Sequence, residues 1–301
     1  MNLYIYVKPS DLTQTQMRAL EKSFSKVVVT DDNNYELLYE DNEPKVVALD
    51  PDIVGWKFEN EVIDRIPQLR AICLETTGYE WIDSEYCAKK DIAVTNVPHY
   101  ATNAVAEKCV MMALALAKKL PLFQKAGGMN WDDEFIGEEM WDKPTDIVGF
   151  GEIGQSLARK LDGIVGRKEI CYYQRHQVET PYHYLSFEEM LAASEYMFIT
   201  AAKNPESLAL FNDLSKFNKN MKIIIVANGF EDVAERMAKM VGEGQLGGVA
   251  FESDDLGKSY DRNVFITPHN AYYTKEALEQ MFEIWVKTVL SVTGEIINRV
   301  N

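Results

Sequence analysis

The sequence contains few residues of the types that mark disulfide scaffolds, metalloproteins and nucleic-acid-binding proteins. Its four cysteines lie far apart without a Cys-x-x-Cys pair, and its four histidines show no metal-ligand spacing, so we expect reduced thiols and no metal site. Only 31 Lys and Arg residues accompany 47 Asp and Glu residues, and the formal net charge is −16. Because nucleic acids and anionic membranes bind clustered positive charge, we expect neither as a partner.

Long apolar runs are also absent. The stretch from Cys109 to Ala117 is among the longest, and it is too short to cross a bilayer. The first eight residues lack the basic start and the cleavage site of a signal peptide, and we interpret them as a strand. With 47% hydrophobic and 26% charged residues, the composition is typical of a globular protein, and we expect a cytoplasmic one with one or two domains.

Short apolar strands alternate with amphipathic segments along the chain, which predicts the α/β class with parallel sheets covered by helices. A long helix is predicted over 101–120, where apolar residues recur at helical spacing as far as Pro121. A first α/β domain is predicted from strands over 3–7, 26–29, 46–48, 71–74 and 92–95, with helices over 14–23, 59–65 and 84–89. A second follows the long helix, with strands over 147–148, 169–173, 196–200, 222–227, 247–251 and 264–267, and a last helix is predicted over 275–293.

A glycine motif, Gly149-x-Gly151-x-x-Gly154, follows a short apolar run and precedes a helical stretch. Gly149 allows a tight turn, Gly151 lets phosphates approach bare backbone, and Gly154 lets the helix pack close to the strand. The N-terminus of such a helix offers free N–H groups and a partial positive charge. The motif, with Glu152 and Ile153 inside it, therefore predicts a binding site for a dinucleotide pyrophosphate.

The choice of dinucleotide depends on the residues after the second strand of this unit. NAD sites usually place a carboxylate about 20 positions past the last glycine, to accept a hydrogen bond from the ribose 2′-OH. Here that position is Gln174, and no acid lies nearby. Arg175 and His176 suit a 2′-phosphate, so we predict NADP(H) in preference to NAD(H). In the alternative interpretation, Arg175 is simply a solvated loop residue.

Several further motifs occur in an order that resembles the D-isomer-specific 2-hydroxyacid dehydrogenase family. Residues 96–107, Asn-Val-Pro-His-Tyr-Ala-Thr-Asn-Ala-Val-Ala-Glu, are similar to a signature of that family. Residues 69–72 followed by Thr77-Gly78-Tyr79 are similar to its substrate loop. The glycine motif, residues 244–248 and Thr267-Pro268-His269 then follow in the order of the family, so the resemblance covers nearly the whole chain.

The resemblance implies two Rossmann-like, doubly wound parallel-sheet domains with a cleft between them. Residues 1–98 and 271–301 would form a discontinuous, flavodoxin-like substrate domain, and residues 99–270 would form the NAD(P)-binding domain. The helix over 101–120 would contribute to a homodimer interface, although it could instead be an intramolecular core helix. The expected cofactor contacts include Thr200, Ala227 and Glu252, and the expected substrate contacts are Thr77, Gly78, Tyr79 and Tyr100.

The family uses a His as proton donor, an Arg to hold the substrate carboxylate and a Glu to keep the His protonated. His269 matches the first role, because histidine exchanges protons near neutral pH. The family Arg falls on Asn228, which donates a neutral hydrogen bond but carries no charge. The Glu is not matched, and Asp254 or Asp255 could supply the carboxylate. Arg262 or Lys258 could replace the missing cation.

The sequence therefore predicts an oxidoreductase that transfers hydride between NAD(P)H and a small 2-oxo or 2-hydroxy acid with D stereospecificity. Thr77-Gly78-Tyr79 resembles the version in hydroxypyruvate and glycerate-type members. The alternative is a catalytically impaired NAD(P)-binding sensor or interaction protein of the same fold. The absent Arg favours this alternative, whereas His269, the glycine motif and the substrate-loop pattern favour the enzyme.

Overall fold

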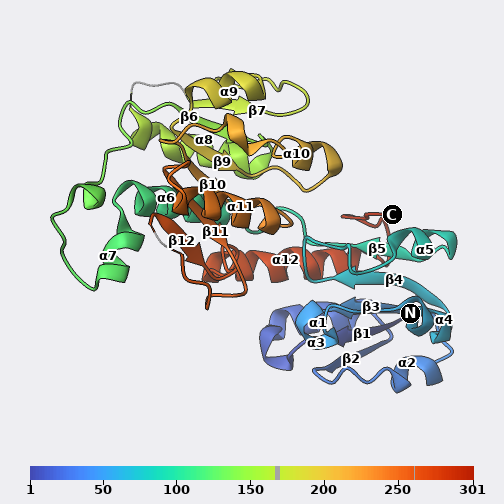
Figure 1. Cartoon of the computed structure of the whole chain (residues 1–301). Coiled ribbons are helices and arrows are strands. Elements are labelled where there is room, and N and C mark those ends of the chain that lie inside the picture. The colour runs from blue at the N-terminus through green and yellow to red at the C-terminus, as the bar shows by residue number, and fades with distance from the viewer. Residues whose placement is uncertain (167–169, 261) are drawn as a thin grey trace. The chain divides into compact units, whose positions relative to one another are not determined.

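Parallel strands form two separate sheets in the computed structural model of the chain (Figure 1). The structure describes residues 1–166, 170–260 and 262–301. The chain divides into two compact units: unit 1 contains residues 1–100 and 275–301, and unit 2 contains residues 101–274. Both units have helices packed against a parallel sheet, which confirms the predicted fold class.

The sheet of unit 1 has five strands in the order β2-β1-β3-β4-β5. Strands β1 and β3 are buried along their whole length, as expected of parallel strands that helices cover on both faces. The strands are β1 (Asn2–Tyr6), β2 (Lys26–Thr30), β3 (Lys45–Leu49), β4 (Leu69–Leu74) and β5 (Ala93–Thr95). The helices are η1 (Pro9–Asp11), α1 (Gln14–Ser23), α2 (Glu36–Glu40), α3 (Pro51–Val54), α4 (Asn60–Arg65), α5 (Ser84–Lys89) and α12 (Lys275–Ser291).

Helix α12 joins the end of the chain to the sheet of unit 1. Its Trp285 is 1% exposed and packs in a core cluster with residues of β1, β3 and β4. The Trp285 indole N–H donates a hydrogen bond to the Cys73 carbonyl at 3.1 Å. The core of unit 1 therefore contains residues from both ends of the sequence.

The sheet of unit 2 has seven strands in the order β12-β11-β10-β9-β6-β7-β8. The strands are β6 (Thr145–Val148), β7 (Ile170–Tyr173), β8 (His183–Tyr184), β9 (Tyr196–Ile199), β10 (Lys222–Ile225), β11 (Gly248–Glu252) and β12 (Val264–Thr267). The helices are α6 (Thr102–Ala117), α7 (Leu120–Ala126), η2 (Asp133–Phe135), α8 (Glu152–Val165), α9 (Phe187–Ala193), α10 (Pro205–Ala209), η3 (Leu214–Lys216) and α11 (Glu231–Gly242). The strand predicted over 169–173 begins at Glu169, which lies outside the described residues.

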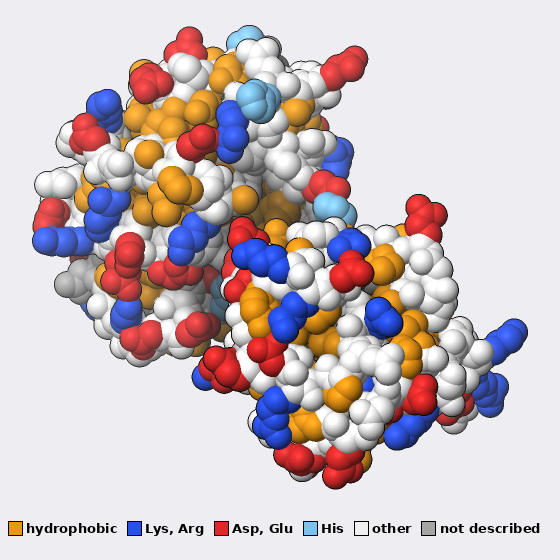
Figure 2. All heavy atoms as spheres, turned by 90° about the vertical axis from the view of Figure 1, so that its right-hand side faces the viewer, with side chains coloured by type: hydrophobic (Ala, Val, Ile, Leu, Met, Phe, Trp, Pro, Cys, Tyr) orange, Lys and Arg blue, Asp and Glu red, His pale blue; other side chains and the backbone are white. Residues whose placement is uncertain are grey.

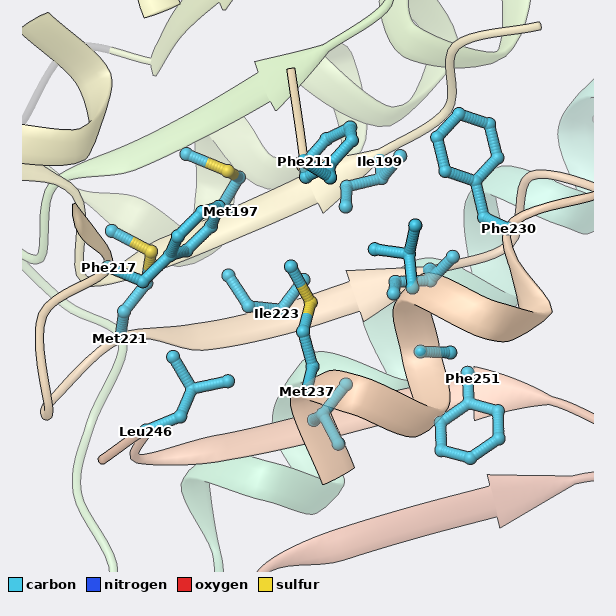
Figure 3. Close-up of a cluster of buried hydrophobic side chains, with 14 of the residues drawn as sticks. Met197, Ile199, Phe211, Phe217, Met221, Ile223, Phe230, Met237, Leu246 and Phe251 are labelled. Atoms are coloured by element: carbon cyan, nitrogen blue, oxygen red, sulfur yellow. The ribbon is translucent and has the colours of Figure 1, made fainter. Parts of the chain in front are cut away.

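Two apolar clusters cover the two faces of this sheet. One contains side chains of α6 and α8 and the other contains side chains of α9 and α11. Figure 3 shows the second cluster, which includes Met197 and Ile199 of β9, with Ile223 of β10 beside Met237 of α11. Phe230, which directly precedes α11, is fully buried in the same cluster and fixes the loop between β10 and α11.

The prediction of one helix over 101–120 is wrong at its end. Helix α6 ends at Ala117, and α7 begins at Leu120 with Pro121 in its first turn. Lys119 between them has a left-handed backbone with φ 56°, which breaks the helical path. A proline that ends one helix is equally suited to the first turn of the next, because its missing N–H would have no helical partner there.

The surface in Figure 2 carries acidic and basic side chains that alternate with apolar ones. The excess of acidic residues in the sequence is therefore distributed over this face and does not form one acidic area. Within the described ranges, the helices are too short or too polar to cross a bilayer.

Candidate active site

The glycine motif joins the end of β6 to the start of α8. Gly149 has φ 93°, and a Cβ there would lie 2.4 Å from the Ala201 backbone. A Cβ at Gly154 would lie 2.3 Å from the Gly149 carbonyl oxygen. Both glycines are therefore required by the close approach of backbone segments, as the sequence predicted for this motif.

Gly151 differs from the other two glycines, because a Cβ there would meet nothing within 4 Å. It is the N-cap of α8, a helix of 14 residues, and its own side chain position faces open space. Glu152 and Ile153 form the first turn of α8, and Thr200 donates a hydrogen bond of 2.6 Å to the Gly149 carbonyl. The N-terminus of α8 thus presents backbone N–H groups and has room for a phosphate against bare backbone.

The loop after β7 contains the residues predicted to select the coenzyme. Gln174 turns back on its own loop and donates to the His176 carbonyl at 2.7 Å. Arg175 forms an ion pair with Glu206, with 2.9 Å between Nε and Oε2. Glu206 lies in the first turn of α10, after β9, so the carboxylate beside Arg175 comes from a distant part of the sequence. Both side chains are more than half exposed.

A narrow pocket lies at the carboxyl ends of β10, β11 and β12. Its lining includes Ala227, Asn228, Glu231, Glu252 and His269. Asn228 follows β10, and His269 follows β12 after Pro268. The structure therefore brings together His269, Asn228 and two of the residues predicted to bind the cofactor.

Glu252 is the residue that lies beside His269. It ends β11, its side chain is 6% exposed, and its Oε2 lies 3.9 Å from the His269 Nδ1. Its Oε1 accepts hydrogen bonds from the backbone N–H groups of Asn270 and Ala271, at 3.1 and 2.9 Å. The Lys108 ammonium lies 3.8 Å from the same oxygen. The carboxylate is thus anchored by one oxygen, and the other faces the imidazole.

The acids predicted to pair with His269 lie elsewhere. Asp254 and Asp255 are exposed, and Asp255 accepts a hydrogen bond from Gly257 N–H at 3.0 Å within its own turn. Among the described residues, Glu252 is the acid within 4.0 Å of the His269 ring. The sequence analysis assigned Glu252 to the cofactor and left the family Glu unmatched.

Neither predicted substitute for the missing cation lies at this pocket. Lys258 forms an ion pair with Glu235 of α11. Arg262 precedes β12 and lies beside Gly244, in a pocket at the amino ends of the strands. Strand β12 separates it from His269, which follows the carboxyl end of the same strand.

The substrate residues predicted in unit 1 lie in the loop after β4, which side-chain hydrogen bonds hold in place. The Thr77 hydroxyl donates to the Val97 carbonyl at 2.6 Å, and the Trp81 indole donates to the Gly78 carbonyl at 3.1 Å. Within the described part of the chain, the N–H groups of Thr77, Gly78 and Tyr79 have no hydrogen-bond acceptor. These three N–H groups are therefore available to donate hydrogen bonds to an anion. Tyr79 and Tyr100 are half-buried and pack against the two core clusters of unit 1.

Glu75, at the start of the same loop, was not identified from the sequence. It is 6% exposed, and its Oε2 has no hydrogen-bond partner among the described residues. Burial, strengthened by the negative charges of Asp50, Asp11 and Asp52, raises the pKa of Glu75 to about 9. The Glu75 carboxyl is therefore neutral near pH 7.

Nearly the whole chain matches a known protein family. A family model described as "D-isomer specific 2-hydroxyacid dehydrogenase, catalytic domain" matches residues 6–301. The chain is 29% identical to the glyoxylate reductase of Pyrococcus furiosus over 267 residues, which cover 81% of this chain and 79% of the relative. It is 27% identical over 246 residues to the glycerate dehydrogenase of Hyphomicrobium methylovorum, covering 75% of this chain and 76% of the relative.

Solved structures share the fold at lower identity. An acyclic imino acid reductase in complex with NADPH and D-Arg has a TM-score of 0.76 at 20% identity, with both chains covered completely. The D-lactate dehydrogenase of Aquifex aeolicus, in complex with NAD and lactic acid, has a TM-score of 0.71 at 22% identity. That match covers 97% of this chain and 95% of the other.

Alanine at two glycines is expected to separate stability from nucleotide binding. Gly154→Ala should lower the melting temperature, because its Cβ would overlap the Gly149 carbonyl oxygen, 2.3 Å away. Gly151→Ala should leave the melting temperature unchanged, since its Cβ meets only open space and its φ of −71° suits alanine. It should weaken NAD(P)H binding about tenfold or more, as measured by calorimetry, because the phosphates need that space. Unchanged binding by Gly151→Ala would contradict this assignment.

Glu75→Gln is expected to stabilise the protein at alkaline pH. The folded-state pKa of about 9 lies above the usual 4.5, so unfolding releases a proton and stability is lost as the pH rises through this range. Glutamine keeps the shape of the side chain without this proton. The variant should therefore match the wild type in melting temperature at pH 4.5 and exceed it at pH 8, by roughly 2 kcal/mol or more in unfolding free energy.

The control is Glu295→Gln, at an exposed position of unit 1. It should leave the melting temperature unchanged at both pH values. A difference between Glu75→Gln and wild type that does not vary with pH would show that the Glu75 carboxyl is ionised in the folded protein.

Proposed function

Since the chain belongs to the D-isomer-specific 2-hydroxyacid dehydrogenase family, we propose that it reduces a small 2-oxo acid to the D-2-hydroxy acid with NAD(P)H. The observation that carries the proposal is the His269–Glu252 pair at the carboxyl ends of β11 and β12. An imidazole held beside a buried carboxylate is suited to giving and taking a proton.

The reaction needs a hydride, a proton and a fixed substrate. A nicotinamide coenzyme held at the glycine loop would supply the hydride for the carbonyl carbon. His269 donates its proton to the carbonyl oxygen, which becomes the hydroxyl group of the product. Glu252 stabilises the protonated imidazole before the transfer, because its free Oε2 faces Nδ1 and its burial strengthens the attraction. In the reverse direction His269 accepts the proton.

The glycine loop fits the pyrophosphate of the coenzyme. The open position at Gly151 and the backbone N–H groups at the start of α8 would hold the phosphates, with Thr200 supporting the loop through the Gly149 carbonyl. We propose that NADP(H) is preferred to NAD(H), with Arg175 as the group that meets the 2′-phosphate. Glu206 opposes this preference, because it already neutralises Arg175.

The substrate is proposed to be a short 2-oxo acid such as glyoxylate or hydroxypyruvate. The similarity to glyoxylate reductases and a glycerate dehydrogenase supports this class. The free N–H groups of Thr77, Gly78 and Tyr79 would donate hydrogen bonds to its carboxylate. Asn228 would add a neutral hydrogen bond at the carbonyl side of the site.

We propose a cytoplasmic homodimer. The segment from α7 to η2 and the residues beyond it expose large apolar side chains, with exposed fractions of 64% for Met129, 85% for Trp131 and 67% for Ile136. Such exposed apolar groups are typical of a surface that a partner covers. The four cysteines are free thiols, which agrees with a reducing compartment.

A second candidate function is an NAD(P)-binding sensor or interaction protein with impaired catalysis. Asn228 favours this candidate, because the family position that holds the substrate carries no positive charge here. Coenzyme binding without turnover of any 2-oxo acid would support it.

His269→Ala is expected to lower kcat for glyoxylate or hydroxypyruvate by about 10²–10⁴-fold, because the variant has no proton donor. The rate is followed by the loss of NAD(P)H absorbance, and coenzyme binding is measured separately and should be retained. His183→Ala, on the exposed strand β8, is the matched control and should keep full activity. Equal activity in His269→Ala and His183→Ala would refute the proposed proton donor.

Two substitutions in one ion pair should shift coenzyme preference in opposite directions. Arg175→Ala is expected to weaken NADPH binding about tenfold relative to NADH, and Glu206→Gln is expected to strengthen it, because Arg175 is then released from its partner. Dissociation constants for both coenzymes, measured by fluorescence titration, provide the test. Tighter binding of NADH than of NADPH by the wild type would reverse the proposed preference.

A further inference from the structure

The pocket at His269 has a shortage of positive charge. Its lining includes the carboxylates of Glu231 and Glu252 and the neutral amide of Asn228, and it includes no Lys or Arg among the described residues. A 2-oxo acid carries a negative charge, and its carbonyl oxygen becomes more negative during reduction. Lys108 offsets the charge of Glu252 from outside the lining. Among the described residues no cation of the lining faces a substrate, and this would weaken the binding and reduction of a 2-oxo acid.

A lysine lies against the loop after β10, which contributes Asn228 to this pocket. A Cβ built on Gly229, the neighbour of Asn228, would lie 2.2 Å from the Lys203 Cδ, 3.0 Å from Cε and 3.1 Å from Cγ. The Lys203 side chain therefore crosses directly over Gly229. A side chain at position 229 would displace the lysine from this position, and the φ of 81° at Gly229 also favours glycine.

The strand order gives the direction of the crossing. Lys203 lies in the loop after β9, and Gly229 lies in the loop after β10. In the sheet, β10 stands between β9 and β11, and β12 follows β11. A side chain that starts after β9 and passes over Gly229 thus extends toward the strand ends that carry Glu252 and His269.

The backbone that presents Lys203 is held by hydrogen bonds. Asn204 caps α10 by accepting from the Ser207 N–H at 2.9 Å, and its own N–H donates to the Ser207 hydroxyl at 3.0 Å. The Ser207 hydroxyl in turn donates to the Ala202 carbonyl at 2.8 Å. The residues on both sides of Lys203 are therefore fixed, while its charged end is exposed.

The Lys203 ammonium has no hydrogen-bond acceptor or ion-pair partner in the described ranges. Other lysines near the site are already engaged: Lys108 donates to the Asn270 side chain at 2.5 Å, and Lys258 pairs with Glu235. Lys203 is thus a positive charge available to a ligand at this end of the sheet.

We propose that Lys203 is a substrate-binding residue that supplies the positive charge missing at position 228. Its ammonium donates a charge-assisted hydrogen bond to the carboxylate of the 2-oxo acid and offsets the charge that develops on the carbonyl oxygen. This inference rests on the proposed function. Gly229 leaves room for the Lys203 side chain. Lys203, in the loop after β9, would thus replace the Arg that the family has at position 228, in the loop after β10.

The test compares Lys203→Met, Lys203→Arg and wild type in steady-state reduction of glyoxylate and hydroxypyruvate. Methionine keeps the length of the side chain without its charge. We expect KM to rise and kcat/KM to fall about tenfold or more in Lys203→Met, with the dissociation constant of NAD(P)H unchanged. Lys203→Arg should recover most of the loss. The control, Lys216→Met, changes a lysine of η3 that precedes the amino end of β10, and it should have no effect.

A second arm uses position 228. Asn228→Arg should rescue Lys203→Met, because one cation can replace the other. Unchanged kcat/KM in Lys203→Met, or a loss confined to coenzyme binding, would overturn the role of Lys203 and leave the proposed function standing. If the wild type reduces no 2-oxo acid, calorimetry with oxamate and NAD(P)H decides: binding that Lys203→Met weakens supports the cation role, and absence of binding overturns both proposals.

Discussion

All strands of the unit 2 sheet run in the same direction, and the site depends on this constraint. Parallel strands bring their carboxyl ends to one edge, where the loops that follow them meet. Thr200, Asn228, Glu252 and His269 each end or follow a different strand. The apolar strands between them are buried under helices on both faces, so the polar groups are concentrated at the edge and kept out of the core.

Glu252 illustrates how a buried charge is tolerated at this edge. An isolated carboxylate at 6% exposure would be costly, because it loses its hydration. Two backbone N–H groups and a lysine ammonium replace that water around Oε1. The other oxygen is left for the imidazole. The two oxygens of one side chain therefore have different tasks, one structural and one electrostatic.

The sequence predicted the features that depend on local pattern. The glycine motif lies between a strand and a helix as expected, the fold class is confirmed, and the predicted family is confirmed by a match over residues 6–301.

Features that depend on contacts between distant segments were missed. Nothing near Arg175 in the sequence reveals Glu206, which lies after another strand, and nothing near Gly229 reveals Lys203. The sequence assigned Glu252 to the cofactor, because its place beside His269 depends on the pairing of β11 with β12. Hydrophobic periodicity is read over many residues. It therefore cannot reveal the two-residue strand β8 or the break in the helix at Lys119.

The position of α12 has a consequence for the order in which the protein folds during synthesis. Met281, Trp285, Val286 and Val289 belong to the same core cluster as residues of β1, β3 and β4. The first hundred residues leave the ribosome early, yet their sheet has an uncovered apolar surface until the last thirty follow. Unit 2 is continuous in sequence, so its core does not depend on a segment that is synthesised much later. The segment made first is thus the one completed last, and its surface is where a nascent chain of this protein most needs protection from aggregation.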